Sequence, residues 1–309
     1  MTAQNLEDAA IAACAELGLQ PPKNFTRGRW LQVALVDGSK TAGRIKLFDD
    51  GKGGIAFNWT TGDKRAFFVD ADFVPRKPTK AQIRKAARAK RKREAERRAK
   101  YDGAAERAAR IWREAVPAET HPYLKRKNIE ANGARLGRWV RLVEDQHGNR
   151  ARIIIPGALL VPMYNASGEI RGLQSIFAEK HPVLERDKDF TPGCERAGCF
   201  WWIGPKNPDP RASVLICEGF ATAASLHAET GFRVYIAFSA NNLLPVARIV
   251  RERLPDADIV LCADNDAKTK GNPGVAHATA AALAVNARLA VPPIDGDFND
   301  FANQNNDIQ

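Results

Sequence analysis

Long hydrophobic runs are absent from this sequence of 309 residues. No window approaches the roughly 18 uninterrupted apolar residues that a membrane-spanning helix needs, so we expect no membrane segment and no membrane partner. Residues 1–19 carry acidic side chains but no basic stretch, so we expect no secretory signal peptide there. The odd number and scattered spacing of the five cysteines favour a reduced, cytoplasmic protein.

Cysteine is scarce, and two common motifs are missing. The five cysteines are scattered and form no Cys-x-x-Cys pair, which argues against a disulfide scaffold and against a zinc ribbon. Cys194 and Cys199 lack two further ligands nearby, so we interpret them as structural residues and expect no zinc. The phosphate-binding pattern Gly-x-x-x-x-Gly-Lys-Ser/Thr is also absent. We therefore expect no fused helicase motor, and a replicative helicase partner would be a separate protein.

The composition is that of a folded protein. Hydrophobic residues make up 44% of the chain and charged residues 27%, which excludes disorder throughout and a fibrous repeat. A chain of this length typically forms two domains or slightly more.

The net charge of +11 is concentrated in one segment. Residues 76–113 contain 16 Lys and Arg against 4 Asp and Glu, a balance of +12, whereas the rest of the chain has a balance of −1. No Gly or Pro interrupts residues 80–102. This predicts a helix of about 35 Å, which resumes after Gly103 and stops at Pro117.

This helix would carry basic side chains on nearly every face. The alanines between them leave no broad apolar surface, so we expect a solvated arm, a linker or a rod that binds phosphates. In the last case it would contact nucleic acid through Arg84, Arg88 and Lys92.

Residues 1–75 are predicted to form a small module of one helix and an antiparallel sheet. Leu6–Leu17 has the pattern of an amphipathic helix. Apolar runs between Asp and Gly turns predict four strands, at Trp30–Val36, Gly43–Phe48, Gly54–Trp59 and Arg65–Phe68. The aromatic side chains of this module either fill its core or stack on bases.

The second half of the chain begins with a predicted β-hairpin. Ala158–Tyr164 is an apolar run, Asn165–Gly168 is a turn, and Glu169–Phe177 is the return strand. Apolar runs and helical segments then alternate. The runs are Val214–Cys217, Val234–Phe238, Ile259–Ala263 and Leu289–Val291.

Continuous apolar strands that alternate with helices predict a parallel sheet covered on both faces. The sequence therefore predicts an α/β fold in four segments. These are an N-terminal α+β module (1–75), a basic helical linker (76–117), a mixed α+β segment (118–208) and the parallel sheet with its helices (209–309).

Acidic residues directly follow the apolar runs of the last segment. Glu218 follows the first run, Asp264 and Asp266 follow the third, and Asp297 and Asp300 come after the fourth. Because parallel strands end at one edge of a sheet, these carboxylates can meet although they are far apart in sequence.

Several carboxylates at one edge cannot all stay ionised cheaply without a cation between them. Oxygen ligands favour Mg²⁺ or Mn²⁺ over zinc, and such an ion can bridge phosphate oxygens. The alternative is that these acids only cap the helices that follow them. The presence of Glu218 beside Asp264 and Asp266 favours the metal site.

Short motifs across residues 118–303 resemble one family. Cys217-Glu218-Gly219 and Asp264-Asn265-Asp266 resemble the Toprim domain of bacterial-type primases, topoisomerases and small nucleases. Further matching stretches are His121-Pro122-Tyr123-Leu124, Leu159–Met163, Asn241–Pro245 and Phe298-Asn299-Asp300. The likeness is strongest to Toprim primases of conjugative plasmids and phages, the TraC type, and it thins out before residue 118.

The resemblance implies roles for single residues. Glu218, Asp264 and Asp266 would be the catalytic residues, with Glu218 acting in general acid/base chemistry or completing the metal site. Asp264 and Asp266 would be metal ligands. Asp297 or Asp300 would add an auxiliary acid, and the sequence does not choose between them.

The resemblance also implies contacts with the template and with nucleotides. The hairpin at 158–177 is similar to the strand pair that helps to form a basic template cleft in primases. Lys188 stands before Phe190-Thr191-Pro192 as a lysine does in the family, and is a candidate for phosphate contact. Lys125, Arg126 and Arg171 are further candidates.

Three functions are consistent with these features. The first is a primase that joins ribonucleoside triphosphates on single-stranded DNA with Mg²⁺ or Mn²⁺, in plasmid or phage replication or in conjugative transfer. The second is a Toprim nuclease that uses the same metal site. The third is a non-catalytic protein of a mobile element that binds single-stranded DNA.

Overall fold

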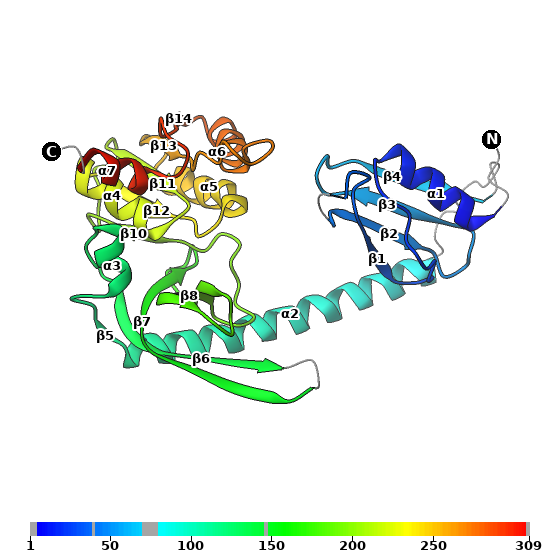
Figure 1. The fold of residues 1–309 in the computed structure, drawn as a ribbon, viewed down its shortest axis with the longest axis horizontal. Helices are drawn as coiled ribbons and strands as arrows, with labels where there is room; N and C mark the ends of the chain where they lie inside the picture. The colour runs from blue at the N-terminus through cyan, green and yellow to red at the C-terminus, as the bar shows by residue number, and fades with distance from the viewer. Residues whose placement is uncertain (1–4, 39–40, 70–79, 145–147, 307–309) are drawn as a thin grey trace. The chain divides into compact units, whose positions relative to one another are not determined.

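The computed structural model describes residues 5–38, 41–69, 80–144 and 148–306, and Figure 1 shows the elements they form. The chain divides into two compact units, Met1–Ala87 and Arg88–Gln309. Helix α2 (Lys80–Glu114) runs across this boundary. The finer division into four segments stays a prediction.

The first unit is a four-stranded antiparallel sheet with one helix. Helix α1 (Leu6–Glu16) begins after Asn5, whose side-chain oxygen accepts a hydrogen bond from the Asp8 N–H. The strands pair in the order β1-β2-β3-β4 and comprise Trp30–Val33, Gly43–Leu47, Gly53–Asn58 and Lys64–Phe68. The predicted helix and strands are confirmed, with ends that differ by three residues or fewer.

One face of this sheet is buried beneath α1 (Figure 1). Cys14 of the helix packs with Ile45 and Phe67 of the strands, and all three are buried. Among the aromatic residues, Phe67 joins the core as one of the two predicted alternatives requires. Trp30 and Trp59 do not, since they are 52% and 66% exposed.

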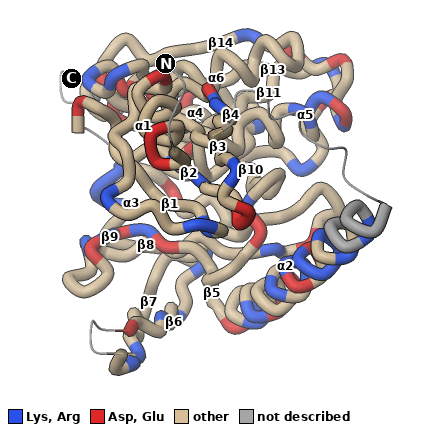
Figure 2. The backbone as a smooth tube through the Cα atoms, turned by 90° about the vertical axis from the view of Figure 1, so that its right-hand side faces the viewer, with Lys and Arg blue, Asp and Glu red and all other residues tan. Residues whose placement is uncertain are grey.

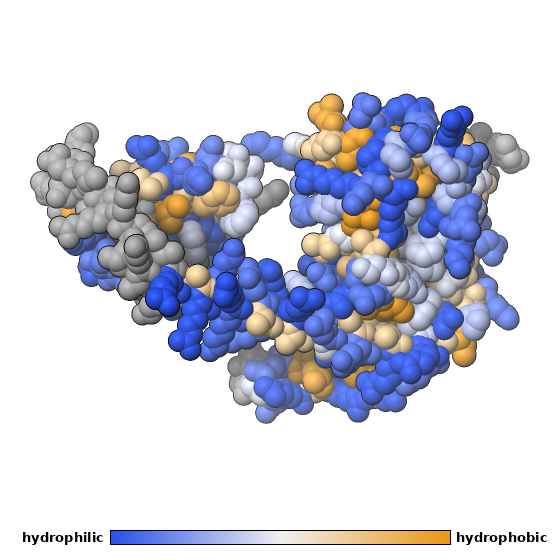
Figure 3. All heavy atoms as spheres, turned by 180° about the vertical axis from the view of Figure 1, so that it is seen from behind, coloured by the Kyte–Doolittle hydropathy of each residue, from blue (hydrophilic) through white to orange (hydrophobic). Residues whose placement is uncertain are grey.

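Helix α2 holds the basic segment in one continuous helix. Gly103 does not interrupt it, contrary to the prediction, because a glycine inside a helix costs only about 1 kcal/mol relative to alanine. The neighbouring Ala104 and Ala105 are buried and stabilise this part of the helix. Lys and Arg recur along α2 in Figure 2, and its surface is largely hydrophilic in Figure 3.

The last turns of α2 are packed, which corrects the prediction of a helix that is solvated throughout. Ala108, Ile111 and Trp112 pack with Trp139 and Leu160 of the second unit. Residues 87–100 are exposed. The helix is therefore solvated in its middle and anchored at its end.

The second unit contains an antiparallel sheet in the order β5-β6-β7-β8-β9. Its strands are Val116–Pro117, Arg135–Glu144, Arg150–Tyr164, Ile170–His181 and Arg186–Phe190, and helix α3 (Pro122–Lys127) lies between β5 and β6 in sequence. The predicted hairpin is confirmed as β7 and β8. Strand β7 begins eight residues earlier than predicted because its first half pairs with β6, which the apolar pattern did not indicate.

The same unit contains a second five-stranded sheet in the order β10-β12-β11-β13-β14. Strands β11, β12, β13 and β14 are parallel as predicted, whereas β10 is an antiparallel edge strand that the sequence did not indicate. In sequence order, β10 to β14 are Trp201–Ile203, Ser213–Cys217, Arg233–Ile236, Asp258–Cys262 and Arg288–Ala290. The helices are α4 (Phe220–Thr230), η1 (Ala240–Asn242), α5 (Leu243–Arg253), α6 (Pro273–Ala284) and α7 (Phe298–Asn306).

Both faces of the parallel sheet are covered, which confirms the predicted α/β fold. Helices α5 and α6 pack over one face, on Ile216 and Ile259. Helix α4 and the antiparallel sheet cover the other, where Leu159 and Ile176 pack with Leu215. Within the described ranges, no helix combines the length and the apolar character that crossing a bilayer requires.

Candidate active site

Strands β11 and β13 carry three of the predicted acidic residues just beyond their carboxyl ends. The two strands are parallel neighbours, so the residues that follow them lie at one edge of the sheet. Glu218 follows β11, and Asp264 and Asp266 follow β13. The Asp266 carboxylate raises the pKa of Glu218, and the Glu218 and Asp266 carboxylates raise that of Asp264, so the three groups lie within electrostatic reach of one another. The structure thus places them together as predicted.

Glu218 is half-buried at the turn into α4. Burial and the Asp266 carboxylate raise the pKa of Glu218, while Lys188 and the N–H of Ala240 oppose this shift. The Phe238 N–H donates a hydrogen bond of 2.9 Å to the carbonyl oxygen of Glu218. Phe238 has a φ of 64°, in the left-handed region, which costs a non-glycine residue about 1–3 kcal/mol. The end of β12 therefore fixes the backbone at Glu218.

Asp264 lies in the least compensated surroundings of the three. Its Oδ1 is buried and has no hydrogen-bond partner among the described residues. Burial and the Glu218 and Asp297 carboxylates raise the pKa of Asp264 to about 7. Buried polar atoms without a partner are rare and costly. A proton or a bound cation would compensate this oxygen.

Asp266 is held differently, although it is only two residues away. Its Oδ2 accepts a hydrogen bond of 3.1 Å from the Gly274 N–H in the first turn of α6, and its own N–H donates to Asn272 Oδ1 at 2.9 Å. A side chain at Gly274 would collide with the carbonyl oxygen of Asp264. The helix-capping alternative therefore describes part of the role of Asp266, but it does not describe Asp264.

A second loop is fastened to the loop that carries these two aspartates. Asn265 and Gly296 exchange backbone hydrogen bonds of 2.8 and 3.0 Å. The Asn265 side chain also donates to the carbonyl oxygens of Pro292 and Ile294, at 3.2 and 2.8 Å. This pairing brings Asp297 to the acidic edge.

The two candidates for the auxiliary acid have different surroundings. Asp297 Oδ1 accepts hydrogen bonds from the N–H groups of Asn299 and Asp300, at 2.8 and 3.0 Å, and so caps α7. Asp300 forms an ion pair of 2.8 Å with Lys127. Although burial acts in the opposite direction, this ion pair lowers the pKa of Asp300.

The pKa shifts link Asp297 to two of the predicted catalytic acids. Asp297 raises the pKa of both Glu218 and Asp264. The charge of Asp300 is instead neutralised by Lys127. We therefore favour Asp297 as the auxiliary acid.

Lys188 and Tyr123 complete this edge. Lys188 lowers the pKa of both Glu218 and Asp264, so its ammonium group lies near them. It also lies 5.6 Å from the centroid of the Tyr123 ring. The Tyr123 hydroxyl is buried without a hydrogen-bond partner among the described residues, and burial together with Asp297 raises its pKa.

Sequence reasoning assigned no role to Tyr123, although this residue stands in one of the family-like motifs. His121 caps α3 by accepting a hydrogen bond of 3.1 Å from the Tyr123 N–H, and this fixes the start of the helix. The ring reaches the acidic edge only because α3 packs against β8, beside β9. No local pattern in the sequence indicates that packing.

The carboxylates do not form a ready-made metal site. Within the described ranges, no group of three or more His, Cys, Asp or Glu side chains is placed so that it could hold a metal ion. The chemistry of the donors nevertheless fits Mg²⁺ or Mn²⁺, since all are oxygen ligands and one of them, Asp264 Oδ1, lacks a partner. The five cysteines are free thiols.

The remaining predicted nucleic-acid contacts fall into two groups. Arg171 is 14% exposed and binds Asp102 and Glu195 at 2.8 and 3.1 Å, so it fastens α2 to β8. This placement favours a structural role for Arg171. The others lie on helices with exposed side chains, namely Lys125 and Arg126 on α3 and Arg84, Arg88 and Lys92 on α2.

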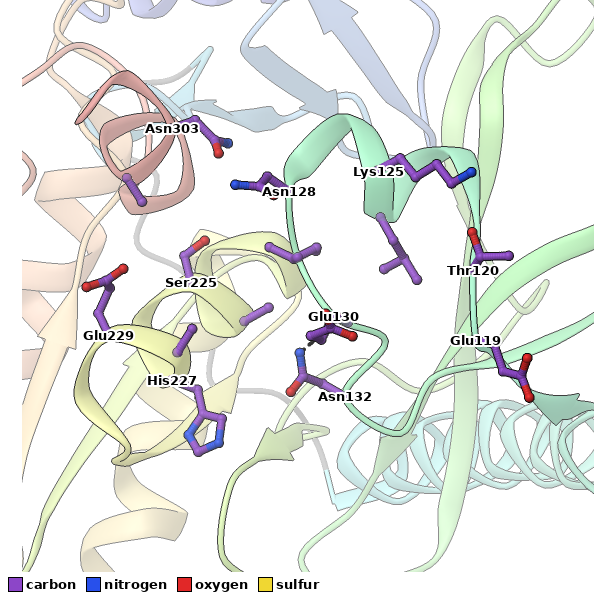
Figure 4. Close-up of a pocket in the computed structure, with 15 residues that line it drawn as sticks. Glu119, Thr120, Lys125, Asn128, Glu130, Asn132, Ser225, His227, Glu229 and Asn303 are labelled. Carbon is purple, nitrogen blue, oxygen red and sulfur yellow. Dashed lines mark hydrogen bonds between the residues drawn. The ribbon is translucent and has the colours of Figure 1, made fainter. Parts of the chain in front are cut away.

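A separate pocket of about 580 Å³ lies between α3, α4 and α7 (Figure 4). Lys125 and three glutamates, Glu119, Glu130 and Glu229, line it together with uncharged residues. None of the five predicted metal ligands is among its described lining residues. The pocket is therefore distinct from the acidic edge.

Comparison with known proteins finds similarity to one domain family and to primases. Residues 213–307 match the family model of the Toprim domain. The chain is 28% identical to the DNA primase TraC of Escherichia coli over 266 residues, which cover 84% of this chain and 22% of TraC. A second Escherichia coli TraC is 29% identical over 197 residues, which cover 62% of this chain and 12% of that protein.

The chain thus spans about a fifth of one curated relative and about an eighth of the other. Among solved structures, the zinc-binding and RNA polymerase domains of the Aquifex aeolicus primase align with a TM-score of 0.47 and 11% identity, over 85% of this chain and 76% of that one. The carboxylates of the acidic edge lie within the matched residues, whereas Lys188 and Tyr123 precede them. Residues 213–307 are therefore similar to Toprim domains, and most of the chain is similar in sequence to a segment of the DNA primase TraC.

Proposed function

We propose that this chain is a DNA primase, which synthesises short RNA primers on single-stranded DNA by nucleotidyl transfer. The observation that carries the proposal is the group of electrostatically linked carboxylates, Glu218, Asp264, Asp266 and Asp297, at one edge of the Toprim domain beside Lys188. The similarity to the DNA primase TraC supports this reaction. A role in plasmid or phage replication or in conjugative transfer is part of the proposal.

The carboxylates would hold one or more Mg²⁺ or Mn²⁺ ions. Asp264 and Asp266 would be the main ligands, with Glu218 and Asp297 beside them. Such an ion supplies charge that stabilises the attacking and leaving oxygens of a phosphoryl group. Asp264 supports this role because its oxygen is buried without a partner and its pKa of about 7 keeps part of it protonated near neutral pH.

Lys188 would bind phosphate oxygens of the incoming ribonucleoside triphosphate or of the template. Its ammonium group offers three donors, and the Tyr123 ring lies against it at 5.6 Å. The positive charge also offsets the repulsion between Glu218 and Asp264. In this role Tyr123 is a positioning residue, because it acts through Lys188.

The exposed part of α2 would bind the backbone of the template strand. Residues 87–100 are exposed and rich in Lys and Arg, so they offer charge without a shape that selects a sequence. Arg88 and Lys92 belong to this stretch, and Arg84 precedes it. A separate replicative helicase remains a predicted partner.

A primer-synthesis assay tests the proposal. The protein is incubated with single-stranded DNA, labelled ribonucleotides and Mg²⁺ or Mn²⁺, next to the variants Glu218→Gln and Asp264→Asn. We expect short, metal-dependent RNA products from the wild type and none from either variant. Asp295→Asn is the matched control, because Asp295 lies close to Asp297 in sequence but is paired with Lys268 at 2.9 Å.

Two results would contradict the proposal. Normal synthesis by Asp264→Asn would show that the assigned edge is not the active site. Cleavage of labelled template by the wild type without nucleotides, together with no synthesis on varied templates, would instead favour a Toprim nuclease.

A further inference from the structure

The antiparallel sheet of the first unit has one face that α1 does not cover. Buried strand residues such as Ile45, Leu47 and Phe67 belong to the core beneath α1. Successive residues of a strand point to opposite faces, so Arg44, Lys46 and their neighbours in register point away from that core. We call this surface the outer face; it is formed by the outward residues of β1 to β4 and by Phe48 and Trp59, which directly follow β2 and β3 and pack with outward residues.

Aromatic and basic side chains are cross-strand neighbours on the outer face. One row aligns Trp30, Lys46 and Ile55 on neighbouring strands. The next row aligns Arg44 with Phe57, and Phe57 with Lys64. No strand position of the outer face is acidic, whereas Glu16 and its partner Arg65 lie on the side of α1.

The aromatic rings stand at the surface. Trp30 is 52% exposed and Trp59 is 66% exposed. Trp59 packs edge-on against Phe57, with ring centroids 4.5 Å apart. Phe48 and Phe68 lie together at the other end of the face, with centroids 6.4 Å apart.

Exposed rings separated by Lys and Arg are complementary to a strand with unpaired bases. Bases stack on aromatic faces, and the basic side chains neutralise the phosphates between them. A double helix would hide its base faces from these rings, and an apolar protein partner would leave Arg44, Lys46 and Lys64 without counter-charges. The basic charge and the exposed rings of the outer face therefore indicate single-stranded nucleic acid as its ligand.

We propose that the outer face of the first unit is a stacking platform for single-stranded DNA, separate from the active site. Binding of unpaired bases follows from the residues of this sheet alone. The choice of DNA over RNA rests on the proposed function, because the template of a primase is DNA. The first unit would then supply template affinity that does not depend on a metal ion or on nucleotides.

The test measures the dissociation constant of fluorescent oligo-dT for the full chain by anisotropy, without metal ions or nucleotides. Salt is raised to weaken the purely electrostatic contribution of α2. We expect Trp30→Ala/Trp59→Ala to bind about tenfold more weakly, whereas Trp30→Phe/Trp59→Phe keeps most of the affinity. The matched control is Ile11→Ala, since Ile11 is 43% exposed on α1.

A second measurement follows intrinsic fluorescence during the same titration. Binding should quench the wild-type signal, and the quench should largely disappear in Trp30→Phe/Trp59→Phe although that variant still binds. Wild-type affinity of the alanine variant for oligo-dT, or an equal loss in Ile11→Ala, would overturn the proposal. Tighter binding of oligo-U than of oligo-dT would overturn the choice of DNA.

These outcomes are distinct from those of the synthesis assay. Asp264→Asn should bind oligo-dT like the wild type. If the wild type binds oligo-dT through Trp30 and Trp59 but makes no primers, the proposed function fails and the platform stands. If primers are made and the alanine variant binds normally, the platform fails and the proposed function stands.

Discussion

The sheet that carries the acidic site and the sheet of the first unit place their polar chemistry in different positions. Helices and a second sheet cover both faces of the parallel sheet, so only the residues beyond its strand ends, such as Glu218 and Asp264, are free to act. Among the described residues, α1 covers one face of the antiparallel sheet of the first unit, and the other face displays Trp30 and Lys46. Packing leaves the strand ends of the parallel sheet accessible, and the acids lie there. It leaves the outer face of the first unit's sheet outside the core, and the aromatic rings lie there.

The difference also concerns how each surface is held. The acidic edge contains buried groups that lack compensation, such as Asp264 Oδ1, and is kept in place by paired loops and a strained residue, Phe238. The outer face consists of ordinary strand positions in register. Unfavourable free energy that the folded state retains, as at the acidic edge, is typical of a catalytic site. A surface without such strain, as on the outer face, is typical of a binding surface.

The largest expected effect is that variants of the two surfaces lose different activities, one losing primer synthesis and the other losing DNA binding. Asp264→Asn should lower primer synthesis at least about a hundredfold, because it removes one of the charges that would hold the cation. Its affinity for oligo-dT should stay within about twofold of the wild type. Trp30→Ala/Trp59→Ala should show the reverse, with weaker binding but near-normal synthesis at saturating template.

Primer yield measured across a template titration checks this pair of variants. A fall in maximal synthesis for the tryptophan variant as large as that for Asp264→Asn would merge the two surfaces into one functional site. That result would contradict the separation of a catalytic edge from a binding face.

The second prediction concerns stability against pH. The usual pKa of Asp264 is 3.8, and burial with nearby carboxylates raises it to about 7. Between pH 3.8 and about pH 7, the folded state therefore binds more protons than the unfolded state. The free energy of unfolding consequently falls as the pH rises through this interval. Above pH 7, Asp264→Asn should be more stable than the wild type by on the order of 2 kcal/mol.

Urea denaturation with a chelator, repeated across pH, measures this difference. The gain should vanish toward the lower end of the interval, where the wild-type carboxyl is protonated in the folded state. Asp295→Asn should show no such gain, because Lys268 lowers the pKa of Asp295. Equal pH dependence in all three proteins would show that the edge carries no uncompensated charge.

A third prediction separates two acids within the edge. Asp297→Asn should reduce synthesis about tenfold, because Asp297 is electrostatically linked to Glu218 and Asp264. Asp300→Asn should reduce it about twofold or less, since Asp300 pairs with Lys127. Asparagine can keep the capping role at Asp297, so unfolding of that variant should change little. Reversed effects would make Asp300 the auxiliary acid.

The smallest effect is expected in the helix that runs through both units. Gly103→Ala should stabilise the protein by about 0.5–1 kcal/mol, because alanine favours the helix. The added methyl group would contact only Arg107 Nη1 among the described residues, at 3.7 Å. Synthesis and oligo-dT binding should not change, and thermal unfolding together with both assays checks this. A loss in either assay would show that flexibility at Gly103 matters.

Much of the fold could be predicted from local pattern. The strands of the first unit lie between turn residues and mix apolar with polar positions, and the four parallel strands of the last segment coincide with apolar runs, so local pattern predicts both sets. Strands β6 and β10 and the first half of β7 could not be predicted. Their residues alternate irregularly or include Pro156 and Gly157, and pairing with neighbours rather than apolar content holds them.

The candidate site shows the same limit. Strand-end position predicted Glu218, Asp264 and Asp266, because parallel strands deliver their ends to one edge. It could not distinguish Asp297 from Asp300, since the distinction depends on Lys127, which lies 173 residues from its partner. The place of Arg171 between Asp102 and Glu195 likewise depends on how α2 packs.

The sequence by itself determined the class of fold, the position of the acids and the location of the charge, because these depend on periodicity and on order along the chain. Only the tertiary structure decided that Asp264 lacks a partner while Asp266 caps α6, and that Tyr123 lies against Lys188. It also decided that Trp30 and Trp59 stay exposed while Phe67 is buried. Burial, hydrogen bonding and pKa depend on which distant segments pack together, and local pattern does not contain that information.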